Sequence, residues 1–441
     1  MANGLRKKVV VLGGGFGGIH AAMRLGKLPV DVTVVDKKNH HTFQPLLYQV
    51  ALAVLNPAEI ARPIRTVLTS PNTAVLMDEV VGFDLEAHQA ILKSGTKLEY
   101  DYLVLATGST HSYFGKDEWA HLAPGLKTIE DAIEIRRRVL LAFELAERQM
   151  LETGEQRPLN FVVIGGGPTG VELAGAISDI AKLYMRHDFR HIDPANARVL
   201  ILEGSPAILA AYPEDLQQSA VEQLKQLGVK VRVNAHVSDV QPGYVMVGDE
   251  RIDSVVTLWA AGVQASPLGK LLGVETDRRG CVMVDKFLHP AGHPEVFVCG
   301  DLAHVESDGK QVPGVAQPAM QMGTYAAKSI LTEIEGRRVE KGFHYFDKGD
   351  MATIGRKAAV AKVVWPFRAH LSGFPAWATW LLVHIFFLIG FRSRLAVFRQ
   401  WAYTYLFFKD GARLVTGSQD LPGWEEHEAA VEPVSQGAPK V

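Results

Sequence analysis

Two glycine-rich turns are the parts of this 441-residue sequence whose residue types and spacing could do chemistry. In the first, Gly13, Gly15 and Gly18 fit the pattern G-x-G-x-x-G and follow the apolar run 9–12. The first glycine of this pattern permits a tight turn, the second lets the backbone approach a pyrophosphate, and the third lets a helix pack on a strand. Asp36 follows Gly18 by 18 residues (36 − 18), close to the spacing of an acid that binds a ribose hydroxyl. The stretch therefore predicts a strand–turn–helix–strand unit that holds a dinucleotide, with the phosphate at the helix N-terminus.

The same pattern recurs at Gly165, Gly167 and Gly170, offset from the first by 152 residues (165 − 13). It follows the apolar run 160–164, and a later apolar run ends at Glu203. The gap from Gly170 to Glu203 is 33 residues, longer than the usual ~20, which we attribute to a lengthened helix and loop. The repeat predicts two nucleotide-binding domains.

Two dinucleotide sites in one chain favour electron transfer between a tightly held FAD and an exchangeable nicotinamide nucleotide. Carboxylates at Asp36 and Glu203 would bind ribose hydroxyls and repel a 2′-phosphate. Gly204, Ser205 and Pro206 follow Glu203, with no arginine to accept that phosphate. NADH is therefore favoured over NADPH.

Composition and charge narrow the class of protein. The length suggests two to three domains, and the net charge of −2 gives no general nucleic-acid signal. Residues 337–413 hold 13 Lys/Arg and 4 Asp/Glu, so this region carries +9 and the remainder −11, which suggests an anionic partner for the region alone. Cys281 and Cys299 form no C-x-x-C pair, so neither a metal site nor a dithiol centre is expected, and we read them as core residues in a reducing compartment. The N-terminus lacks a signal-type apolar run, and the chain is expected to begin in the cytoplasm.

A long apolar run near the C-terminus predicts contact with a membrane. Residues 374–391 are almost free of charge and would form a helix of about 27 Å, at ~1.5 Å per residue, against ~30 Å of hydrocarbon. A short span and a core helix remain open on that length. The next segment alternates Arg392, Arg394 and Arg399 with apolar residues at helical spacing, which favours a helix lying among the headgroups of an anionic membrane. Its apolar positions are Leu395, Phe398, Trp401, Ala402, Tyr405 and Leu406.

From residue 9 to about 333, the sequence resembles the two-dinucleotide-binding flavoprotein reductases, and within them the type II NADH dehydrogenases (NADH:quinone oxidoreductases). The glycine patterns are common to that superfamily, whereas two longer segments are more specific. These are Asn39-His40-His41-Thr42-Phe43-Gln44-Pro45-Leu46-Leu47-Tyr48 and Ala316-Gln317-Pro318-Ala319-Met320-Gln321-Met322-Gly323. Shorter matching segments are Ala106-Thr107-Gly108, Val171-Glu172-Leu173-Ala174-Gly175 and Cys299-Gly300-Asp301.

The expected fold is α/β, with two Rossmann-like dinucleotide-binding domains, the second inserted in the first, and a C-terminal membrane-associating helical region. The expected boundaries are 1–130 and 264–335 for the FAD-binding domain, 131–263 for the NADH-binding domain, 336–418 for the membrane-anchoring region and 419–441 for a disordered tail.

The resemblance implies a set of site residues. The first glycine loop and Asp36 would hold FAD, with Thr107-Gly108 along its path and Asp301 on its ribityl or pyrophosphate part. The second loop, Glu203 and Ala261-Gly262 would hold NADH. The full cofactor-binding set is Gly13, Gly14, Gly15, Phe16, Gly17, Gly18, Asp36, Lys37, Thr107, Gly108, Gly165, Gly167, Pro168, Thr169, Gly170, Glu203, Ala261, Gly262, Asp301, Ala316 and Gln317.

Three catalytic residues are implied in the same way. Glu172 would lie by the nicotinamide and the flavin, and Gln317 and Gln321 would flank the flavin ring and the quinone headgroup. Simpler interpretations remain open: Glu172 suits the positive end of a helix, and the two glutamines could satisfy backbone groups. His40 and His41 are expected as capping or loop residues without a catalytic role.

The implied activity is hydride transfer from NADH to FAD N5, followed by transfer of two electrons to a membrane quinone, with Glu172 as the candidate proton relay. The family does not pump protons, and the expected location is the cytoplasmic face of the cell inner membrane, where the protein would be a peripheral enzyme and a possible homodimer.

Three different activities would use the same glycine loops. A sulfide:quinone oxidoreductase would need cysteines at the flavin, which Cys281 and Cys299 do not convincingly supply. A ferredoxin or rubredoxin reductase would act on a soluble acceptor, and the C-terminal apolar run disfavours it. A non-enzymatic flavoprotein that senses NADH would need only the two nucleotide sites.

Overall fold

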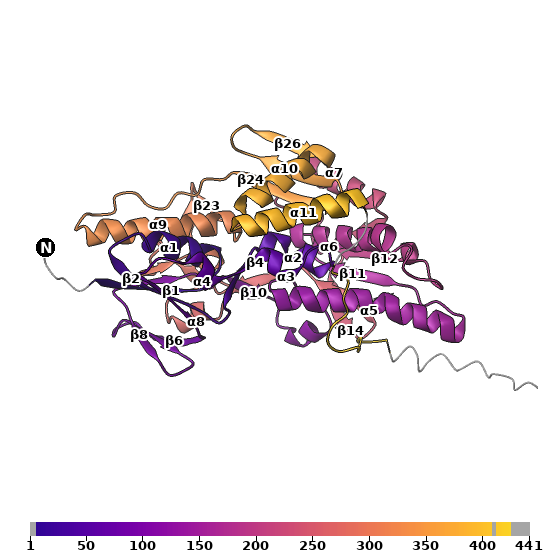
Figure 1. Ribbon diagram of the computed structural model, residues 1–441, viewed down its shortest axis with the longest axis horizontal. Helices are drawn as coiled ribbons and strands as arrows, with labels where there is room; N and C mark the ends of the chain where they lie inside the picture. The colour runs from indigo at the N-terminus through magenta and orange to yellow at the C-terminus, as the bar shows by residue number, and fades with distance from the viewer. Residues whose placement is uncertain (1–5, 408–411, 425–441) are drawn as a thin grey trace, which may run out of the picture. The chain divides into compact units, whose positions relative to one another are not determined.

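The computed structural model describes residues 6–407 and 412–424, which form two compact units (Figure 1). The first unit contains the chain up to Thr42, together with Ala61–His111 and Val263–Asp347. The second contains Phe43–Ile60, Ser112–Gly262 and the chain from Lys348 onward.

This division differs from the expected domain boundaries in three respects. The segment Phe43–Ile60, expected in the FAD-binding domain, belongs to the second unit. The chain enters the main part of the second unit after His111, whereas the sequence suggested residue 130. The C-terminal region, expected to stand apart from residue 336, groups with the second unit from Lys348 onward.

A five-stranded parallel sheet forms the centre of the first unit, in the order β20 (Val296–Val298), β9 (Tyr102–Leu105), β1 (Lys7–Leu12), β2 (Val30–Asp36) and β5 (Thr73–Met77). Apolar residues 9–12 of β1 are buried, as expected for a central strand covered on both faces. Helix α1 (Phe16–Leu25) packs against α9 (Ala316–Ile334) so closely that a Cβ on Gly323 would lie 2.1 Å from the carbonyl oxygen of Gly17. The unit's other elements are β3 (His40–Thr42), β4 (Ala61–Pro63), α4 (Ile64–Val67), β6 (Val80–Asp84), β7 (Gln89–Leu92), β8 (Lys97–Glu99), β10 (Ser109–His111), β18 (Val263–Ala265), α8 (Leu268–Leu271), β19 (Val282–Met283), η5 (Gly300–Leu302), β21 (Ala303–His304), β22 (Glu306–Ser307) and β23 (Lys310–Gln311).

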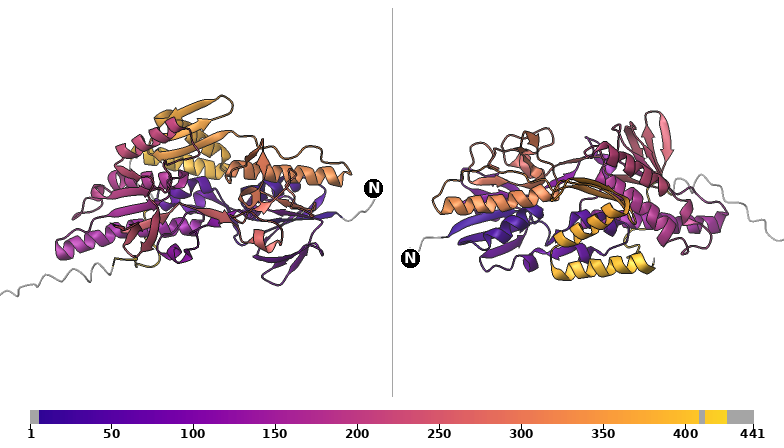
Figure 2. Two further views of the ribbon diagram at one scale, coloured as in Figure 1. Left: turned by 180° about the vertical axis from the view of Figure 1, so that it is seen from behind. Right: turned by 90° about the horizontal axis from the view of Figure 1, so that it is seen from above.

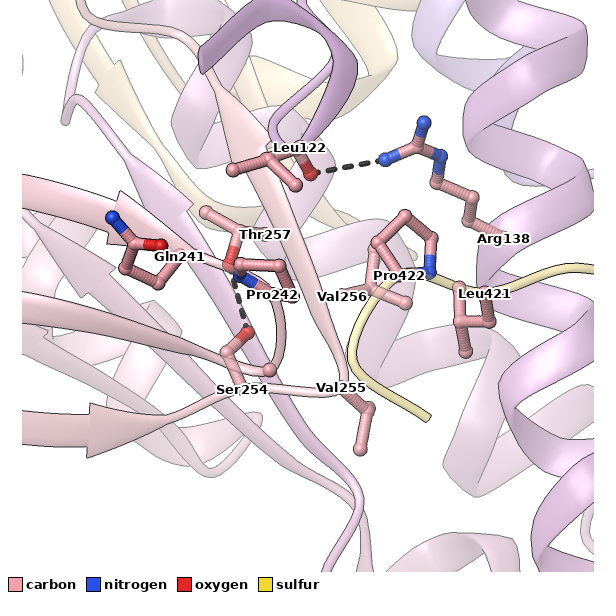
Figure 3. A pocket seen from close by; sticks show the side chains of 11 residues that line it. Leu122, Arg138, Gln241, Pro242, Ser254, Val255, Val256, Thr257, Leu421 and Pro422 are labelled. Carbon is pink, nitrogen blue, oxygen red and sulfur yellow. Dashed lines mark hydrogen bonds between the residues drawn. The ribbon is translucent and has the colours of Figure 1, made fainter. Parts of the chain in front are cut away.

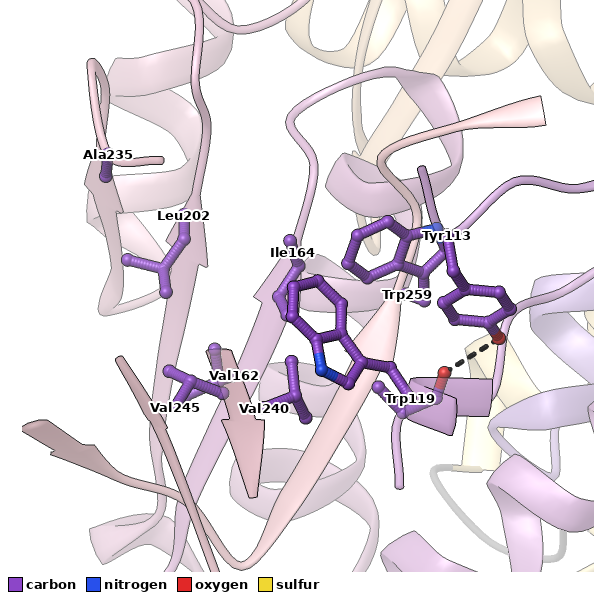
Figure 4. Packing of buried hydrophobic residues seen from close by; sticks show 10 residues of the cluster. Tyr113, Trp119, Val162, Ile164, Leu202, Ala235, Val240, Val245 and Trp259 are labelled. Carbon is purple, nitrogen blue, oxygen red and sulfur yellow. Dashed lines mark hydrogen bonds between the residues drawn. The ribbon is translucent and has the colours of Figure 1, made fainter. Parts of the chain in front are cut away.

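The second unit repeats this plan with a four-stranded parallel sheet, in the order β13 (Val229–Arg232), β12 (Arg198–Leu202), β11 (Asn160–Ile164) and β17 (Val256–Trp259). Figure 4 shows a core at this sheet, in which the Trp259 ring lies 5.0 Å from Tyr113 and 5.8 Å from Trp119. Helix α5 (Ile129–Thr153) begins with the expected capping box: Thr128 accepts from the Asp131 N–H, and Asp131 accepts from the Thr128 N–H. Further elements are η1 (Gln44–Leu46), α2 (Leu47–Ala51), α3 (Pro57–Ile60), η2 (Asp117–His121), α6 (Pro168–Asp179), η3 (Ile180–Tyr184), η4 (Pro194–Asn196), α7 (Glu214–Gln226), β14 (Val237–Gln241), β15 (Tyr244–Val247) and β16 (Glu250–Asp253).

The C-terminal region is only partly helical, contrary to the expectation. It opens with the antiparallel sheet β24 (Gly349–Gly355), β25 (Ala358–Val363) and β26 (Ala369–Ser372). Two helices follow, α10 (Gly373–Phe387) and α11 (Phe391–Phe407), drawn in orange to yellow in Figure 2. Small residues on β25, including Ala359 and Ala361, let α10 pack on this sheet through Ala376 and Trp377.

The apolar run 374–391 is divided, because α10 ends at Phe387 and α11 begins at Phe391. Within residues 6–407 and 412–424, no helix combines the length and the apolar character needed to cross a membrane. The expected apolar stripe of α11 also divides: Trp401 is buried, whereas Leu395 and Phe398 are exposed. The side chains of Tyr405 and Leu406 lie outside the described part of the chain.

An arginine clasp, which we define as Arg136, Arg137 and Arg157, binds the segment 412–424 through its backbone. Arg136 donates to the Ala412 carbonyl at 3.0 Å, Arg137 donates to the carbonyls of residues 418 and 420 at 2.8 Å, and Arg157 donates to that of residue 423 at 3.2 Å. Leu421 and Trp424 are buried. The predicted disordered tail is therefore wrong for residues 419–424, and its remainder, 425–441, lies outside the described residues.

Candidate functional site

The first glycine loop joins β1 to α1. Gly13 has φ +102°, a conformation that glycine adopts readily, and a Cβ on Gly18 would lie 1.8 Å from the Gly13 carbonyl oxygen. Asp36, at the end of β2, accepts from the Gly14 N–H at 2.6 Å and from the Lys38 N–H at 2.7 Å. The carboxylate is thus fixed beside the loop, where the sequence placed it.

The second loop, between β11 and α6, has the same geometry. Gly165 has φ +106°, and a Cβ on Gly170 would lie 1.9 Å from the Gly165 carbonyl oxygen. Glu203 accepts from the Gly166 N–H at 2.6 Å and from the Ser205 N–H at 2.7 Å. The long gap before Glu203 is taken up by the π-helical turn η3, the segment 185–193 and η4, so the acid still ends its strand at the loop.

Both loops leave room for a phosphate group. Gly15 and Gly167 are the N-caps of α1 and α6, and a Cβ on either would meet no atom within 4 Å. Their φ values, −74° and −70°, are accessible to any residue. Backbone geometry therefore does not require glycine at these two positions. Space in front of two helix N-termini, each with a carboxylate alongside, fits two dinucleotides.

Further residues predicted to hold FAD lie at the carboxyl ends of strands in the first unit. Thr107 and Gly108 follow β9, and the Thr107 hydroxyl oxygen is buried without a hydrogen-bond partner within the protein. Asp301, on η5 after β20, accepts from the Ser109 hydroxyl at 2.6 Å. A buried polar atom without a protein partner is what a bound cofactor would satisfy, so these residues fit FAD.

The remaining residues that the sequence predicts to bind a cofactor take four different positions. Lys37 is exposed just after β2, and Ala316 is half-buried at the start of α9. Pro168 and Thr169 form the first turn of α6. Ala261 and Gly262 follow β17, and a Cβ on Gly165 would lie 2.7 Å from Ala261 Cα, so the second loop rests directly on this segment.

Glu172 lies on α6, one turn beyond the second glycine loop. Burial raises the pKa of its carboxyl to about 8, and the only hydrogen bond described for it is a long one, 3.5 Å, from the Thr353 N–H. A carboxyl that changes protonation near neutral pH can accept or release a proton during a reaction. Sequence analysis missed Thr353, because 181 residues separate it from Glu172.

The two glutamines of α9 have different surroundings. Gln321 donates to the Phe346 carbonyl at 3.0 Å and accepts from the Phe346 N–H at 2.9 Å. Its amide therefore fixes the segment after α9, as the simpler interpretation suggested. Gln317 lies one turn earlier and is half-buried.

His41 belongs to strand β3, whereas the sequence suggested a loop. Its ring is buried, with Nδ1 2.9 Å from the Gly14 carbonyl oxygen and the ring edge-on to Phe16. Burial lowers the pKa of His41, so the ring is neutral at pH 7 and can donate from Nδ1 to the loop. Its position supports the first glycine loop, a role the sequence did not indicate.

Two other features lie apart from the predicted site residues. Figure 3 shows a cavity in the second unit, lined by residues such as Arg138, Thr257 and Leu421. Its volume of about 10 Å³ is at the lower limit for one water molecule.

Cys281 and Cys299 are free and buried, and burial raises the pKa of the Cys299 thiol to about 12. In the described residues, no group of three or more His, Cys, Asp or Glu side chains could hold a metal ion.

Comparison with known proteins agrees with this geometry. The profile of the pyridine nucleotide-disulphide oxidoreductases matches residues 7–323. The type II NADH:quinone oxidoreductase Ndh of Mycobacterium tuberculosis is 42% identical over 429 residues, which cover 94% of this chain and 91% of the relative. The type II enzyme NdhA of the same organism is 41% identical, with 94% and 90% covered. The chain belongs to the pyridine nucleotide-disulphide oxidoreductases, in their type II NADH:quinone oxidoreductase branch.

A solved structure resembles this chain over nearly its whole length, beyond the two glycine loops. The structure of NDH2 from Plasmodium falciparum in complex with NADH has a TM-score of 0.82 and 20% sequence identity, and the match covers 93% of this chain and all of the other. The α/β fold expected from the sequence is thereby confirmed, and it includes the C-terminal sheet and helices that the sequence described incompletely.

Proposed function

We propose that this protein is a non-proton-pumping respiratory NADH:quinone oxidoreductase that contains FAD. The observation that carries the proposal is the pair of equivalent glycine loops, each with an acid bound to the loop N–H at 2.6 Å, in a member of the type II branch. In this proposal the first loop holds the retained FAD and the second holds the exchangeable NADH.

Bound FAD would supply the redox chemistry, because its flavin accepts a hydride from NADH and passes two electrons to a quinone. The chain's residues then have positioning and electrostatic roles. Asp36 and the first loop orient the cofactor, and Glu203 and the second loop orient NADH. Glu172 holds or delivers a proton, since its pKa of about 8 keeps the carboxyl largely protonated at pH 7.

The proposal is tested by following the two half-reactions of the flavin separately in stopped-flow experiments. The purified protein should be yellow, NADH should bleach it, and a short-chain quinone should restore the colour over many turnovers. In Glu172→Gln, reduction by NADH should stay within about twofold, while reoxidation by quinone should slow by roughly 100-fold, the lower range for loss of a general acid or base.

Competing activities give distinct results in this experiment. Bleaching by NADH without reoxidation by quinone would indicate an NADH sensor. Reduction of the flavin by sulfide would indicate a sulfide:quinone oxidoreductase, although the raised pKa of the Cys299 thiol disfavours the thiolate such chemistry needs. Unchanged reoxidation in Glu172→Gln across pH would remove the proton role.

We also propose that the enzyme binds the cytoplasmic face of the inner membrane as a peripheral protein. The support is an exposed apolar patch on α10 and α11, with Arg392, Arg394 and Arg399 exposed around it. The patch consists of Phe374, Leu382, Phe386, Phe391, Leu395 and Phe398, each at least 55% exposed. Exposed apolar and cationic residues on the same two helices suit an anionic lipid headgroup layer, from which a lipid-soluble quinone could enter.

Sedimentation with anionic vesicles tests this surface. Deleting residues from Phe374 onward would also remove the buried Trp380 and Trp401, so substitution of exposed residues is the cleaner change. Phe386→Ser with Phe391→Ser should weaken binding at least tenfold at high salt. Met77→Ser with Leu151→Ser, at sites 67% and 66% exposed elsewhere, should leave binding unchanged. Equal loss in both variants would contradict the assignment, and a change from dimer to monomer without loss of vesicle binding would make the patch a homodimer contact.

A further inference from the structure

A series of buried hydrogen bonds connects the C-terminal helix α11 to strand β24 in the second unit. Trp401 Nε1 donates to Gln49 Oε1 at 2.7 Å, and Gln49 Nε2 donates to the Tyr48 hydroxyl at 2.9 Å. The Thr353 hydroxyl donates to the same Tyr48 oxygen at 2.9 Å. All four side chains are buried, and the most exposed, Tyr48, has only 8% of its surface accessible. Because buried polar groups are costly unless paired, this series fixes α2, β24 and α11 relative to one another.

The series ends beside Glu172. Thr353, which binds Tyr48 through its hydroxyl, approaches Glu172 Oε1 through its backbone N–H at 3.5 Å. That distance lies beyond the usual range of 2.7–3.2 Å for such a bond, so a small shift of β24 would make or lose it.

Glycine brings α6 close enough to β24 for this contact. Gly175 lies one turn after Glu172, and a Cβ there would be 1.8 Å from the Ile354 carbonyl oxygen. The ladder between β24 and β25 shifts register between Thr353 and Gly355, next to this crossing. The helix carrying Glu172 therefore rests on the irregular part of the strand that Tyr48 holds.

At its other end, the series reaches the helices that carry the exposed apolar patch. The ring of Trp401 lies 5.6 Å from that of Trp380 on α10, and Trp380 stacks on His384 at 4.0 Å. Arg394 donates to the carbonyls of Leu388 and Phe386 at 2.8 Å, which joins α11 to the end of α10. A change at the patch thus has a continuous packed route to Gln49.

We propose that Tyr48, Gln49, Thr353 and Trp401 are positioning residues that couple the C-terminal helix α11 to the carboxyl of Glu172. This inference rests on the proposed function for its biological meaning. The Tyr48 hydroxyl holds Thr353, the Thr353 N–H stabilises the charged form of Glu172, and Trp401 holds Gln49 from α11. Docking of α10 and α11 on a lipid surface would then act on the protonation of Glu172.

The titration of Glu172 must be distinguished from that of other groups on the elements that pack around the series. Tyr212 interacts electrostatically with Glu172 and with Asp350 of β24, and burial raises the pKa of Tyr212, so its hydroxyl stays protonated. Burial lowers the pKa of His384 to about 4, so this ring is neutral. Asp179, at the far end of α6, binds the Arg356 N–H, and burial raises its pKa to about 6. Asp350 and Asp179 are therefore the carboxyls to exclude.

Infrared titration of the flavin-containing protein measures the Glu172 carboxyl directly. The carboxylic acid band that Glu172→Gln removes, and that Asp350→Asn and Asp179→Asn leave in place, belongs to Glu172. In Tyr48→Phe and Thr353→Val, its midpoint should rise by about one pH unit, because the hydrogen bond to the charged form is weakened. In Trp401→Phe the rise should be about half as large. Tyr244→Phe and Trp424→Phe, which change the same residue types outside the series, should leave the midpoint unchanged.

The pH profile of quinone reoxidation should move with the infrared midpoint in each variant. An unchanged midpoint in Tyr48→Phe and Thr353→Val would overturn the coupling, and so would equal shifts in the two control variants. If the wild-type protein failed to reduce quinone, the proposed function would fail, yet the infrared midpoints would still decide whether α11 acts on Glu172.

Discussion

The two glycine loops are close to geometric copies of one another, yet the helices that leave them differ. In each loop, an acid accepts from the N–H of the second residue, and that residue packs on an isoleucine, Ile64 in the first loop and Ile208 in the second. With the offset of 152, the counterpart of Glu172 is His20 (172 − 152). Burial lowers the pKa of His20 to about 4 and raises the pKa of Glu172 to about 8.

Both residues are therefore largely uncharged at neutral pH. Only the pKa of Glu172 lies close enough to 7 for its protonation to change there. The shifts have opposite directions because burial disfavours the charged form of each side chain, which lowers the pKa of a base and raises that of an acid. The two helices also differ in what covers them: α1 packs on α9, whereas α6 packs on β24 of the C-terminal sheet. Equivalent positions on the two helices thus differ in chemistry because the sequence has a histidine at one and a glutamate at the other.

The largest expected effect comes from filling the open space at each loop. Gly15→Ala should weaken flavin retention by about 10- to 100-fold, and Gly167→Ala should raise the KM for NADH by a similar factor while the protein stays yellow, since a clash costs about 1–3 kcal/mol. Flavin absorbance after dialysis and steady-state kinetics measure the two. Because neither Cβ would touch protein, the unfolding midpoint of the flavin-free protein should not change. Loss of flavin in Gly167→Ala would break the assignment of the two loops.

An intermediate effect is expected at the two acids. Glu203→Gln should lower the ratio of kcat/KM for NADH over that for NADPH about tenfold, or ~1.4 kcal/mol, because the charge that repels a 2′-phosphate is removed. Asp36→Asn should leave that ratio unchanged and weaken flavin retention instead. A change of nucleotide preference in Asp36→Asn would contradict the separate roles of the loops.

The smallest effect, and the one that sharpens the contrast between the helices, is the pH dependence of stability. Folded Glu172 has a pKa above its ordinary 4.5, so its contribution to stability is complete below pH 4.5 and is lost as pH rises through about 8. Folded His20 has a pKa below its ordinary 6.5, so its contribution is present above pH 6.5 and is lost as pH falls through about 4.

Urea midpoints across pH should therefore respond in opposite ways. Glu172→Gln should flatten a fall in stability between about pH 4.5 and 8, and His20→Gln should flatten a rise between about pH 4 and 6.5. A slope that changes with the same sign in both variants would show that the two helices do not differ as described.

Local features of the sequence were sufficient to predict both glycine loops and the start of α5, because each depends on residues close together in the chain. The capping box of Thr128 and Asp131 spans four residues, and the φ > 0 requirement at Gly13 is set within one turn. Glu203 was placed correctly despite its long gap, since the strand pattern identified its position.

Distant contacts could not be read in the same way. The hydrogen bond between Trp401 and Gln49 joins residues 352 positions apart, and that between Thr353 and Tyr48 joins residues 305 positions apart. No local sequence pattern predicts either pair. Strands β24 and β25 are rich in glycine and alanine, which suit close packing on α6 and α10 but carry weak strand preference. The burial of Leu421 and Trp424 depends on the arginine clasp. The clasp binds backbone carbonyl groups, and no side-chain pattern in the sequence reveals such contacts.

The arginine clasp has an evolutionary consequence. Arg136, Arg137 and Arg157 bind carbonyl oxygens, which every amino acid possesses, so the path of residues 412–424 is specified while most of their identities are not. Substitutions in residues 412–424 should leave the segment bound, as long as the three arginines and the buried side chains of Leu421 and Trp424 are kept. Selection on the path of residues 412–424 should then be visible at the arginines of helix α5 and at Arg157, which lie far upstream in the sequence.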